Sequence, residues 1–123
     1  MHKALTAVAV ALATGLALPQ PAIAAPAKGY LIAEIEVTNP TAYEQYRTLV
    51  GPMVTKYGGT YLVRAGKAEA LEGAPPAGRL VVLEFPSYAQ ARAFYDSPEY
   101  RAILPHRTDN SRSRITLIEG FAP

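Results

Sequence analysis

The sequence contains no cysteine and only two histidines, and these absences exclude several kinds of site. Without cysteine, disulfide bonds cannot stabilise the fold. His2 lies near the N-terminus, so His106 is the one histidine available to a folded domain, and we expect no zinc site with several protein ligands. Gly58-Gly59 indicates the end of a helix and not a phosphate loop, and the serines have no histidine at a spacing typical of hydrolases. We therefore predict no metal and no cofactor.

A strong excess of either charge is also absent. The chain has 12 lysines and arginines against 10 acidic residues. The basic residues are scattered, and the nearest approach to a cluster is Arg107 with Arg112 and Arg114. We interpret these three as a solvent-exposed loop, so nucleic-acid binding is not expected.

The N-terminus has the three parts of a secretory signal peptide: a positive start, an uncharged run and a small-x-small cleavage site. The uncharged run, Ala4 to Leu18, is shorter than the ~20 apolar residues that cross a bilayer, so no stable membrane anchor is expected. We predict cleavage after Ala24, at the end of Ala22-Ile23-Ala24, and a periplasmic or secreted protein. The predicted organisation is a signal peptide over residues 1–24, a short segment over 25–28 and one domain over 29–121.

Hydrophobic spacing predicts six elements in the order β-α-β-β-α-β. The strands are expected over residues 29–37, 60–66, 79–85 and 114–121, and the helices over 40–57 and from 88 onward. Ser87 and Gln90 predict a capping box at the second helix, and Gly51-Pro52 predicts a kink or break in the first. This order is typical of the ferredoxin-like α+β fold, a four-stranded antiparallel sheet with two helices on one face, in which the first and third strands are central.

The segment Asp96-Ser97-Pro98 interrupts the second helix. Ser97 suits a helix cap, and Pro98 and Glu99 suit a first helical turn. We therefore predict that one helix ends here and that a short one begins at a new angle, with Tyr100 as a candidate pocket wall.

The two faces of the predicted sheet differ less than expected for a sheet that is open to water on one side. The helix-covered face is apolar. The opposite face is about half aliphatic, whereas a solvated face is mostly polar. Since the chain has no further element to cover this face, we expect a second copy of the protein to do so. Its predicted residues are Tyr30, Ile32, Glu34, Leu62, Arg64, Leu80, Val82, Glu84, Thr116 and Ile118.

Several segments in order resemble the bacterial domain of unknown function 1330 family, within the dimeric α/β-barrel superfamily. The most specific are Tyr57-Gly58-Gly59, Glu84-Phe85-Pro86-Ser87 and Ser97-Pro98-Glu99-Tyr100. The resemblance implies a ferredoxin-like protomer whose sheet packs on its twin to form a barrel. The family implies no shared activity, and the wider superfamily includes cofactor-independent monooxygenases and lactone isomerases.

Glu34, Arg64 and Glu84 are the most suggestive polar residues, because they are predicted on the same sheet face at the dimer side. A dry, unpaired carboxylate is costly, so such groups pair, protonate or meet a ligand. One interpretation is an Arg64–Glu84 salt bridge. The other is a pocket in which Arg64 holds an anion and Glu34 or Glu84 acts as a base. Three further candidates are Tyr30 and Tyr100 as ligand-binding residues and His106 in proton transfer.

Three functions remain open from the sequence. The first is an exported homodimer that binds a small organic molecule in a barrel pocket. The second is a cofactor-independent monooxygenase or isomerase of a small organic acid or aromatic compound. The third is a non-catalytic structural or interaction module.

Overall fold

The computed structural model describes residues 3–4, 6–11, 15–19 and 25–123. The predicted cleavage site, Ala22 to Ala24, lies outside these residues. Within the part of the chain that the structure describes, no helix is long and apolar enough to cross a membrane.

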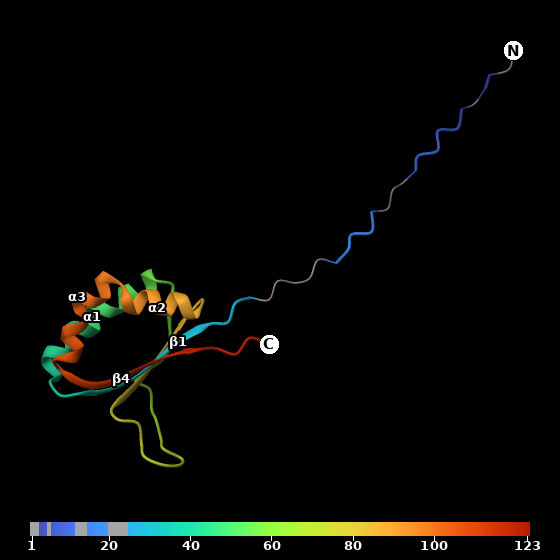
Figure 1. Ribbon diagram of the computed structural model, residues 1–123. Coiled ribbons are helices and arrows are strands. Elements are labelled where there is room, and N and C mark those ends of the chain that lie inside the picture. Colours follow the sequence, from blue (N-terminus) through green and yellow to red (C-terminus); the bar gives the residue numbers. More distant parts are fainter. Residues whose placement is uncertain (1–2, 5, 12–14, 20–24) are drawn as a thin grey trace.

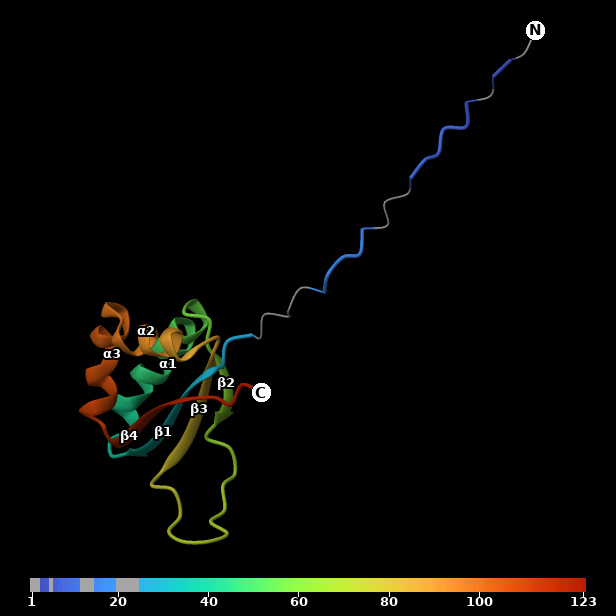
Figure 2. The ribbon, with the colours of Figure 1, turned by 45° about the vertical axis from the view of Figure 1, so that its right-hand side comes forward.

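The domain is an α+β fold in which three helices cover one face of a four-stranded antiparallel sheet (Figures 1 and 2). The strand order is β2-β3-β1-β4, so the predicted ferredoxin-like topology is confirmed, with the first and third strands in the centre. The elements are β1 (Gly29–Val37), α1 (Pro40–Lys56), β2 (Thr60–Arg64), β3 (Arg79–Phe85), α2 (Tyr88–Asp96), α3 (Pro98–Thr108) and β4 (Ser111–Glu119).

Each helix begins at a side-chain cap. Asn39 Oδ1 accepts from the Ala42 amide at the start of α1, and Ser87 Oγ accepts from the Gln90 amide at the start of α2. Gln90 does not complete a capping box, because its side-chain amide donates to the carbonyl of Tyr57 instead. This bond ties α2 to the end of α1.

The interruption at Ser97 is a junction between two helices, as predicted. Ser97 Oγ donates to the Phe94 carbonyl at the end of α2 and accepts from the Tyr100 amide in the first turn of α3. One hydroxyl therefore forms hydrogen bonds with backbone groups of both helices. Pro98 occupies the first turn of α3, where its missing N–H costs nothing.

Helix α1 continues through Pro52, so of the expected kink or break the break is wrong. The helix ends at Lys56 with Tyr57 as its C-cap, and Gly58 adopts φ +80°, a left-handed conformation typical of a helix end. On the far side of Pro52, Val54 is almost fully buried. Its packing in the core holds the last turn of α1 in place despite the proline.

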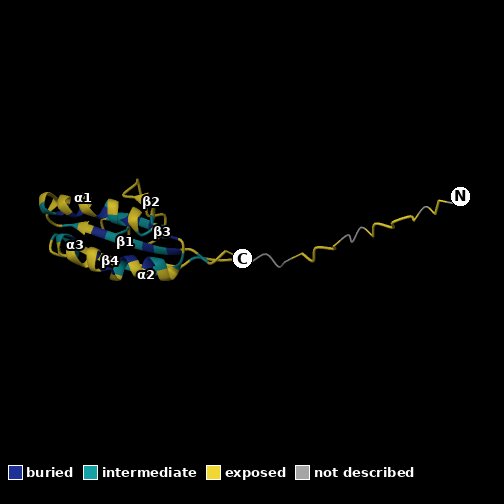
Figure 3. Cartoon of the chain, turned by 90° about the horizontal axis from the view of Figure 1, so that it is seen from above, coloured by how far each residue is buried: buried dark blue, intermediate teal, exposed yellow. Residues whose placement is uncertain are grey.

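The hydrophobic core lies between the sheet and the helices (Figure 3). Every second residue of the central strands packs against aromatic side chains from α1, α2 and α3. Phe85 and Phe94 stack at a centroid distance of 5.2 Å, and Phe94 also contacts Tyr100 at 4.8 Å. Because aromatic side chains supply much of this core, tyrosine hydroxyl groups are carried into its interior.

Strand β2 contains an irregularity, and each residue after it lies on the opposite face of the sheet from the one that regular alternation predicts. Tyr61 pairs with Leu83, but Val63 pairs with Val82 and Arg64 with Val81. The register shift between Tyr61 and Val63 is a β-bulge, which adds one residue and reverses the alternation beyond it. The strand ends at Arg64, earlier than predicted, and the next residue, Ala65, has a φ of 54°.

Strand β4 begins earlier than predicted, at Ser111 rather than Arg114. The polar residues at its start pair with the end of β1, where Val37 lies opposite Ser111 and Glu36 opposite Arg112. Arg112 and Arg114 are therefore strand residues, and the predicted arginine loop is wrong. Arg107 lies in α3 with only 2% of its surface exposed.

Candidate functional site

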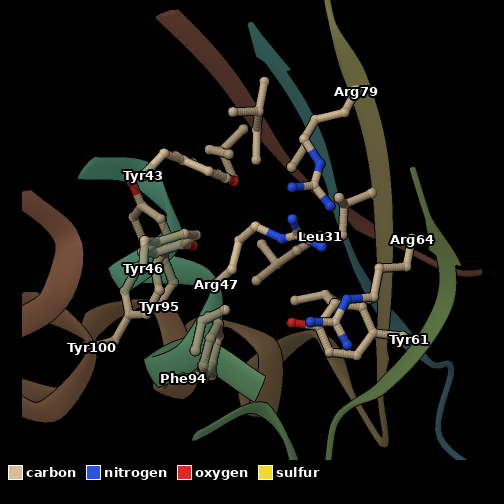
Figure 4. A pocket seen from close by; sticks show the side chains of 16 residues that line it. Leu31, Tyr43, Tyr46, Arg47, Tyr61, Arg64, Arg79, Phe94, Tyr95 and Tyr100 are labelled. Carbon is tan, nitrogen blue, oxygen red and sulfur yellow. The ribbon is translucent and has the colours of Figure 1, made fainter. Parts of the chain in front are cut away.

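A hollow lies between α1 and the helix-covered face of the sheet, and we call it the inner pocket. Its base is aliphatic, and tyrosines and arginines form much of its wall (Figure 4). It is lined by Leu31, Ala33, Ile35, Tyr43, Tyr46, Arg47, Val50, Tyr61, Arg64, Arg79, Val81, Leu83, Phe94, Tyr95, Tyr100 and Ile115.

The inner pocket is small. The space that can hold the centre of a water molecule is about 50 Å³, and the whole hollow including its open mouth is about 560 Å³. Since one water needs roughly 10–15 Å³ on the first measure, the enclosed part has room for only a few small groups. Arg47 and Arg64 are exposed and mark the mouth, whereas Leu31 and Leu83 are buried.

Three arginines converge on the inner pocket from three different elements. The guanidinium groups of Arg47 from α1, Arg64 from β2 and Arg79 from β3 point into the same space (Figure 4). No acidic residue lines the pocket within the described residues. Arg47 pairs at 3.2 Å with Glu44, which is exposed and lies outside the lining. The pocket is therefore a region of positive potential with an apolar base.

Tyrosine rings support two of these arginines. The Arg64 guanidinium carbon lies 4.6 Å from the centroid of the Tyr61 ring, and that of Arg79 lies 5.7 Å from the Tyr43 ring. Such cation–π contacts fix the plane of a guanidinium and leave its N–H groups available at the edge. Buried Nε of Arg79 has no hydrogen-bond partner among the described residues.

A pair of buried phenols lies on the helix side of the same pocket. The Tyr46 and Tyr100 hydroxyl oxygens are 2.8 Å apart, and both residues line the pocket. Burial, together with Tyr100, raises the pKa of Tyr46 far above its usual value, so this phenol stays protonated. Behind them, Arg107 donates to Ser113 Oγ, and its guanidinium carbon lies 5.9 Å from the Tyr46 ring centroid.

The pocket arginines act electrostatically on the tyrosines that face them. Burial raises the pKa of Tyr61, and Arg64 and Arg79 oppose this shift by favouring the phenolate. Burial likewise raises the pKa of Tyr43 against the guanidinium groups, first that of Arg79. In both cases burial prevails, so the hydroxyl groups remain neutral hydrogen-bonding groups.

The predicted carboxylates lie on the opposite, open face of the sheet, and each has a partner there. Glu34 accepts from Arg114 on β4, with Nε at 2.9 Å and Nη2 at 2.6 Å. Glu84 accepts from the Tyr30 hydroxyl at 3.1 Å, and this bond raises the pKa of Tyr30. A depression lined by Ile32, Glu34, Arg114 and Thr116 is the feature nearest to the predicted barrel pocket.

The prediction that Arg64 shares the face of Glu34 and Glu84 is wrong, and so is the proposed Arg64–Glu84 contact. The bulge in β2 turns Arg64 toward the helices and places Val63 opposite Val82 on the open face. As a result, the arginine and the two carboxylates are separated by the sheet.

The other sequence candidates fall in different places. Tyr100 lines the inner pocket, whereas Tyr30 lies on the open face with Glu84. His106 lies in the last turn of α3 and lines neither the inner pocket nor the depression at Glu34 and Arg114. Among those residues no group of three or more His, Cys, Asp or Glu side chains is placed to hold a metal ion.

The sequence interpretation missed Arg47 and Arg79, although each carried a signal. Arg79 has the same parity along β3 as Val81 and Leu83, which face the helices. Arg47 follows Tyr46 directly and precedes Val50 by three residues, so it lies beside the buried stripe of α1. A charged residue beside or within an apolar stripe is the pattern that could have revealed this pocket.

These features define a ferredoxin-like α+β protein with an arginine-lined pocket beneath its helices. The chain belongs to the family described as domain of unknown function (DUF1330), which it matches over residues 28–121. No curated protein matches the chain.

Solved structures of distant proteins share the fold. One is a protein of unknown function from Rhodopseudomonas palustris, with 19% identity and a TM-score of 0.63 over 83% of this chain and 88% of the other. A dimeric ferredoxin-like protein of unknown function from Thermobifida fusca has 19% identity and a TM-score of 0.54, over 76% and 92%. SnoaB, a cofactor-independent oxygenase from Streptomyces nogalater, has 11% identity and a TM-score of 0.53, over 79% and 96%. At these identities the likeness concerns the fold alone.

Proposed function

We propose that the protein binds a small organic molecule in the inner pocket. The observation that carries this proposal is the lining itself: an aliphatic base, five tyrosines and three arginines around a hollow with no acidic residue in the described lining. Ligand sites in proteins combine a mostly apolar concave surface with a few convergent polar groups. The site thus differs from the barrel pocket expected from the sequence, because it lies on the helix side of the sheet.

We further propose that the protein is an exported homodimer whose protomers pack through the open sheet face. Val63 replaces Arg64 on this face and joins Ile32 and Val82, so the face is more aliphatic than the sequence predicts. Leu62 and Ile118 are about half exposed in the single chain. A solvated sheet face is usually polar, which supports a covering partner. The dimeric relative from Thermobifida fusca is consistent with this. The signal-peptide pattern before Ala25 supports export to the periplasm or beyond.

The test is native mass spectrometry of the mature protein, purified gently from the periplasm of an expressing bacterium. We expect a dimer of chains that begin at Ala25, with a reproducible extra mass from a bound molecule. Ile32→Lys places a charge in the open face and is expected to give monomers. Leu49→Lys, at an exposed position of α1, is the matched control and should leave the dimer intact.

Two outcomes would contradict parts of this proposal. A dimer with no extra mass, and no binding in a screen of small organic molecules, would contradict the ligand site. A wild-type monomer would contradict the dimer and would mean that the open face is covered in another way.

A second candidate function is cofactor-independent oxygenation or isomerisation, favoured by the fold shared with the Streptomyces nogalater oxygenase and by the phenol pair at the pocket wall. The carboxylates expected to act as bases do not line the inner pocket, which weakens this candidate. Turnover of a bound ligand would support it. If turnover is found, loss of it in Glu34→Gln or Glu84→Gln would restore the open face as the site of chemistry.

A further inference from the structure

We infer that the ligand of the inner pocket is a small carboxylic acid with a short apolar or single-ring body. This inference rests on the proposed function and specifies the chemical class of the ligand. Its carboxylate would lie between Arg64 and Arg79, and its apolar part would lie against the base of the pocket.

The lining of the inner pocket carries several positive charges. Three guanidinium groups point into one small space (Figure 4), and in the described part of the chain no carboxylate lines that space. Arg47 is partly balanced by Glu44 outside the pocket, but Arg64 and Arg79 form no ion pair within the described residues. Cations that face each other at a partly dry site repel, and an anion between them removes the repulsion.

Arg79 has a buried hydrogen-bond donor without a partner among the described residues. This donor is its Nε, and a buried donor left unsatisfied is costly. The Nε and one terminal nitrogen of a guanidinium form a fork that matches the two oxygens of a carboxylate. A ligand carboxylate would therefore satisfy the donor that the protein leaves open.

Tyrosine rings hold two of the arginines in a fixed orientation. Arg64 lies over the Tyr61 ring and Arg79 faces the Tyr43 ring, so both guanidinium groups are held before a ligand arrives. An arrangement of this kind lowers the entropy lost on binding. Because the N–H groups lie at the edge of each guanidinium plane, they remain free to donate to an anion.

The remaining surface selects an organic acid over an inorganic anion. Leu31, Leu83 and Phe94 also line the pocket, and inorganic phosphate would leave this apolar surface unused. The space that can hold the centre of a water molecule is about 50 Å³, which limits the body of the acid to a short alkyl chain or one ring partly inserted. An apolar body in contact with these side chains would add affinity through surface removed from water.

The experiment measures binding of matched probes to the mature protein by isothermal titration calorimetry. The probes are benzoate and hexanoate, their neutral isosteres benzamide and hexanamide, and inorganic phosphate. We expect each acid to bind roughly ten- to a hundredfold more tightly than its amide, since a hydrogen bond to a charged group is stronger than one to a neutral group. The preference should weaken with added salt.

Variants locate the effect in the pocket. Arg64→Gln changes an exposed side chain and is expected to fold, and Arg79→Gln removes the partly buried fork. Both should reduce the preference for acid over amide by roughly tenfold or more, with little change in amide affinity. Arg112→Gln, exposed on β4 and outside the lining, is the control and should behave as the wild type.

Equal affinity for acids and amides, or a preference that survives both Arg64→Gln and Arg79→Gln, would overturn the carboxylic-acid inference. Binding of phosphate alone would overturn it as well. If neutral molecules bind while acids do not, the proposed function stands and only the ligand class is wrong. If no acid binds, the inference fails, and the extra mass in native spectra decides separately whether the pocket holds any ligand.

Discussion

The hydroxyl groups of Tyr46 and Tyr100 form a hydrogen bond of 2.8 Å that joins α1 to α3 inside the core. The two rings also meet edge to face, with centroids 6.4 Å apart. Both side chains are more than nine-tenths buried, so water cannot replace either partner. This contact is therefore structural as well as part of the pocket wall.

Removing one of these hydroxyl groups should destabilise the protein. In Tyr100→Phe the Tyr46 hydroxyl loses its partner while it stays buried, and we expect a loss of about 1–3 kcal/mol. Urea unfolding followed by circular dichroism measures it. Tyr88→Phe, at an exposed position, is the control and should change stability little. The double variant Tyr46→Phe/Tyr100→Phe should cost less than the sum of the single variants, because neither hydroxyl is then left unpaired; strict additivity would contradict a direct bond.

Asp96 should stabilise the junction of α2 and α3 in a pH-dependent way. Its carboxylate accepts from Arg92 at 2.8 Å and from Arg101 at 3.1 Å. Desolvation raises the pKa of Asp96, but the hydrogen bonds from the two arginines lower it more, and the net pKa lies below the usual 3.8. The stabilisation is therefore present above about pH 4 and is lost as the pH falls through the lowered pKa.

We expect Asp96→Asn to lower the urea midpoint modestly at pH 7, because the groups are exposed. The difference from the wild type should shrink as the pH falls below 3.8. Asp109→Asn, near the end of α3, is the control with no such ion pair among the described residues. A difference that is the same at pH 7 and at acid pH would show that charge is not the cause.

Pro52 should be a site where substitution stabilises the protein. It lies inside α1, where it cannot donate to the carbonyl of Thr48, and its side chain is exposed. Pro52→Ala restores this donor without loss of packing, and we expect a gain of about 1–3 kcal/mol in unfolding free energy. Pro98→Ala, in the first turn of α3, should bring no such gain. Equal effects at both positions would refute this explanation.

Two glycines with similar backbone angles should respond differently to alanine. A Cβ atom at Gly73 (φ +74°) would meet open space, whereas a Cβ atom at Gly78 (φ +76°) would clash with the Ile35 carbonyl oxygen. Gly73→Ala should cost about 1–2 kcal/mol through backbone strain alone. Gly78→Ala should cost more, on the order of 3 kcal/mol or above, because β1 must also move. Thermal unfolding of both variants compares them, and equal costs would show that the loop adapts freely.

Most of the fold could be predicted because its signals are local. Alternation identified β1 and β3, and capping residues such as Ser87 and Ser97 marked where helices begin. The start of β4 was missed because Ser111 and Arg112 are polar, and only their pairing with the long β1 makes them a strand. Pro52 was expected to kink or break α1, but the helix continues because burial of Val54 outweighs the local penalty.

The site was harder to predict than the fold, for a physical reason. Assigning Arg64 to a face requires counting along β2, and one bulge reverses every side chain beyond it. The bulged segment, Leu62-Val63, contains no glycine or proline that would mark it. Arg79 needed no such correction, since simple alternation from Val81 already places it beneath the helices.

The bulge in β2 also means that the pairing register of a strand can set the charge of a binding site. If the same residues paired without the bulge, the Arg64 guanidinium would lie on the open face and the inner pocket would be less positive, with no side chain replaced. The same change of register would introduce a charge into the surface proposed for dimer contact. A change that favours regular pairing at Leu62-Val63 would thus alter ligand preference and self-association together, which makes β2 a natural place to redirect such a protein by design.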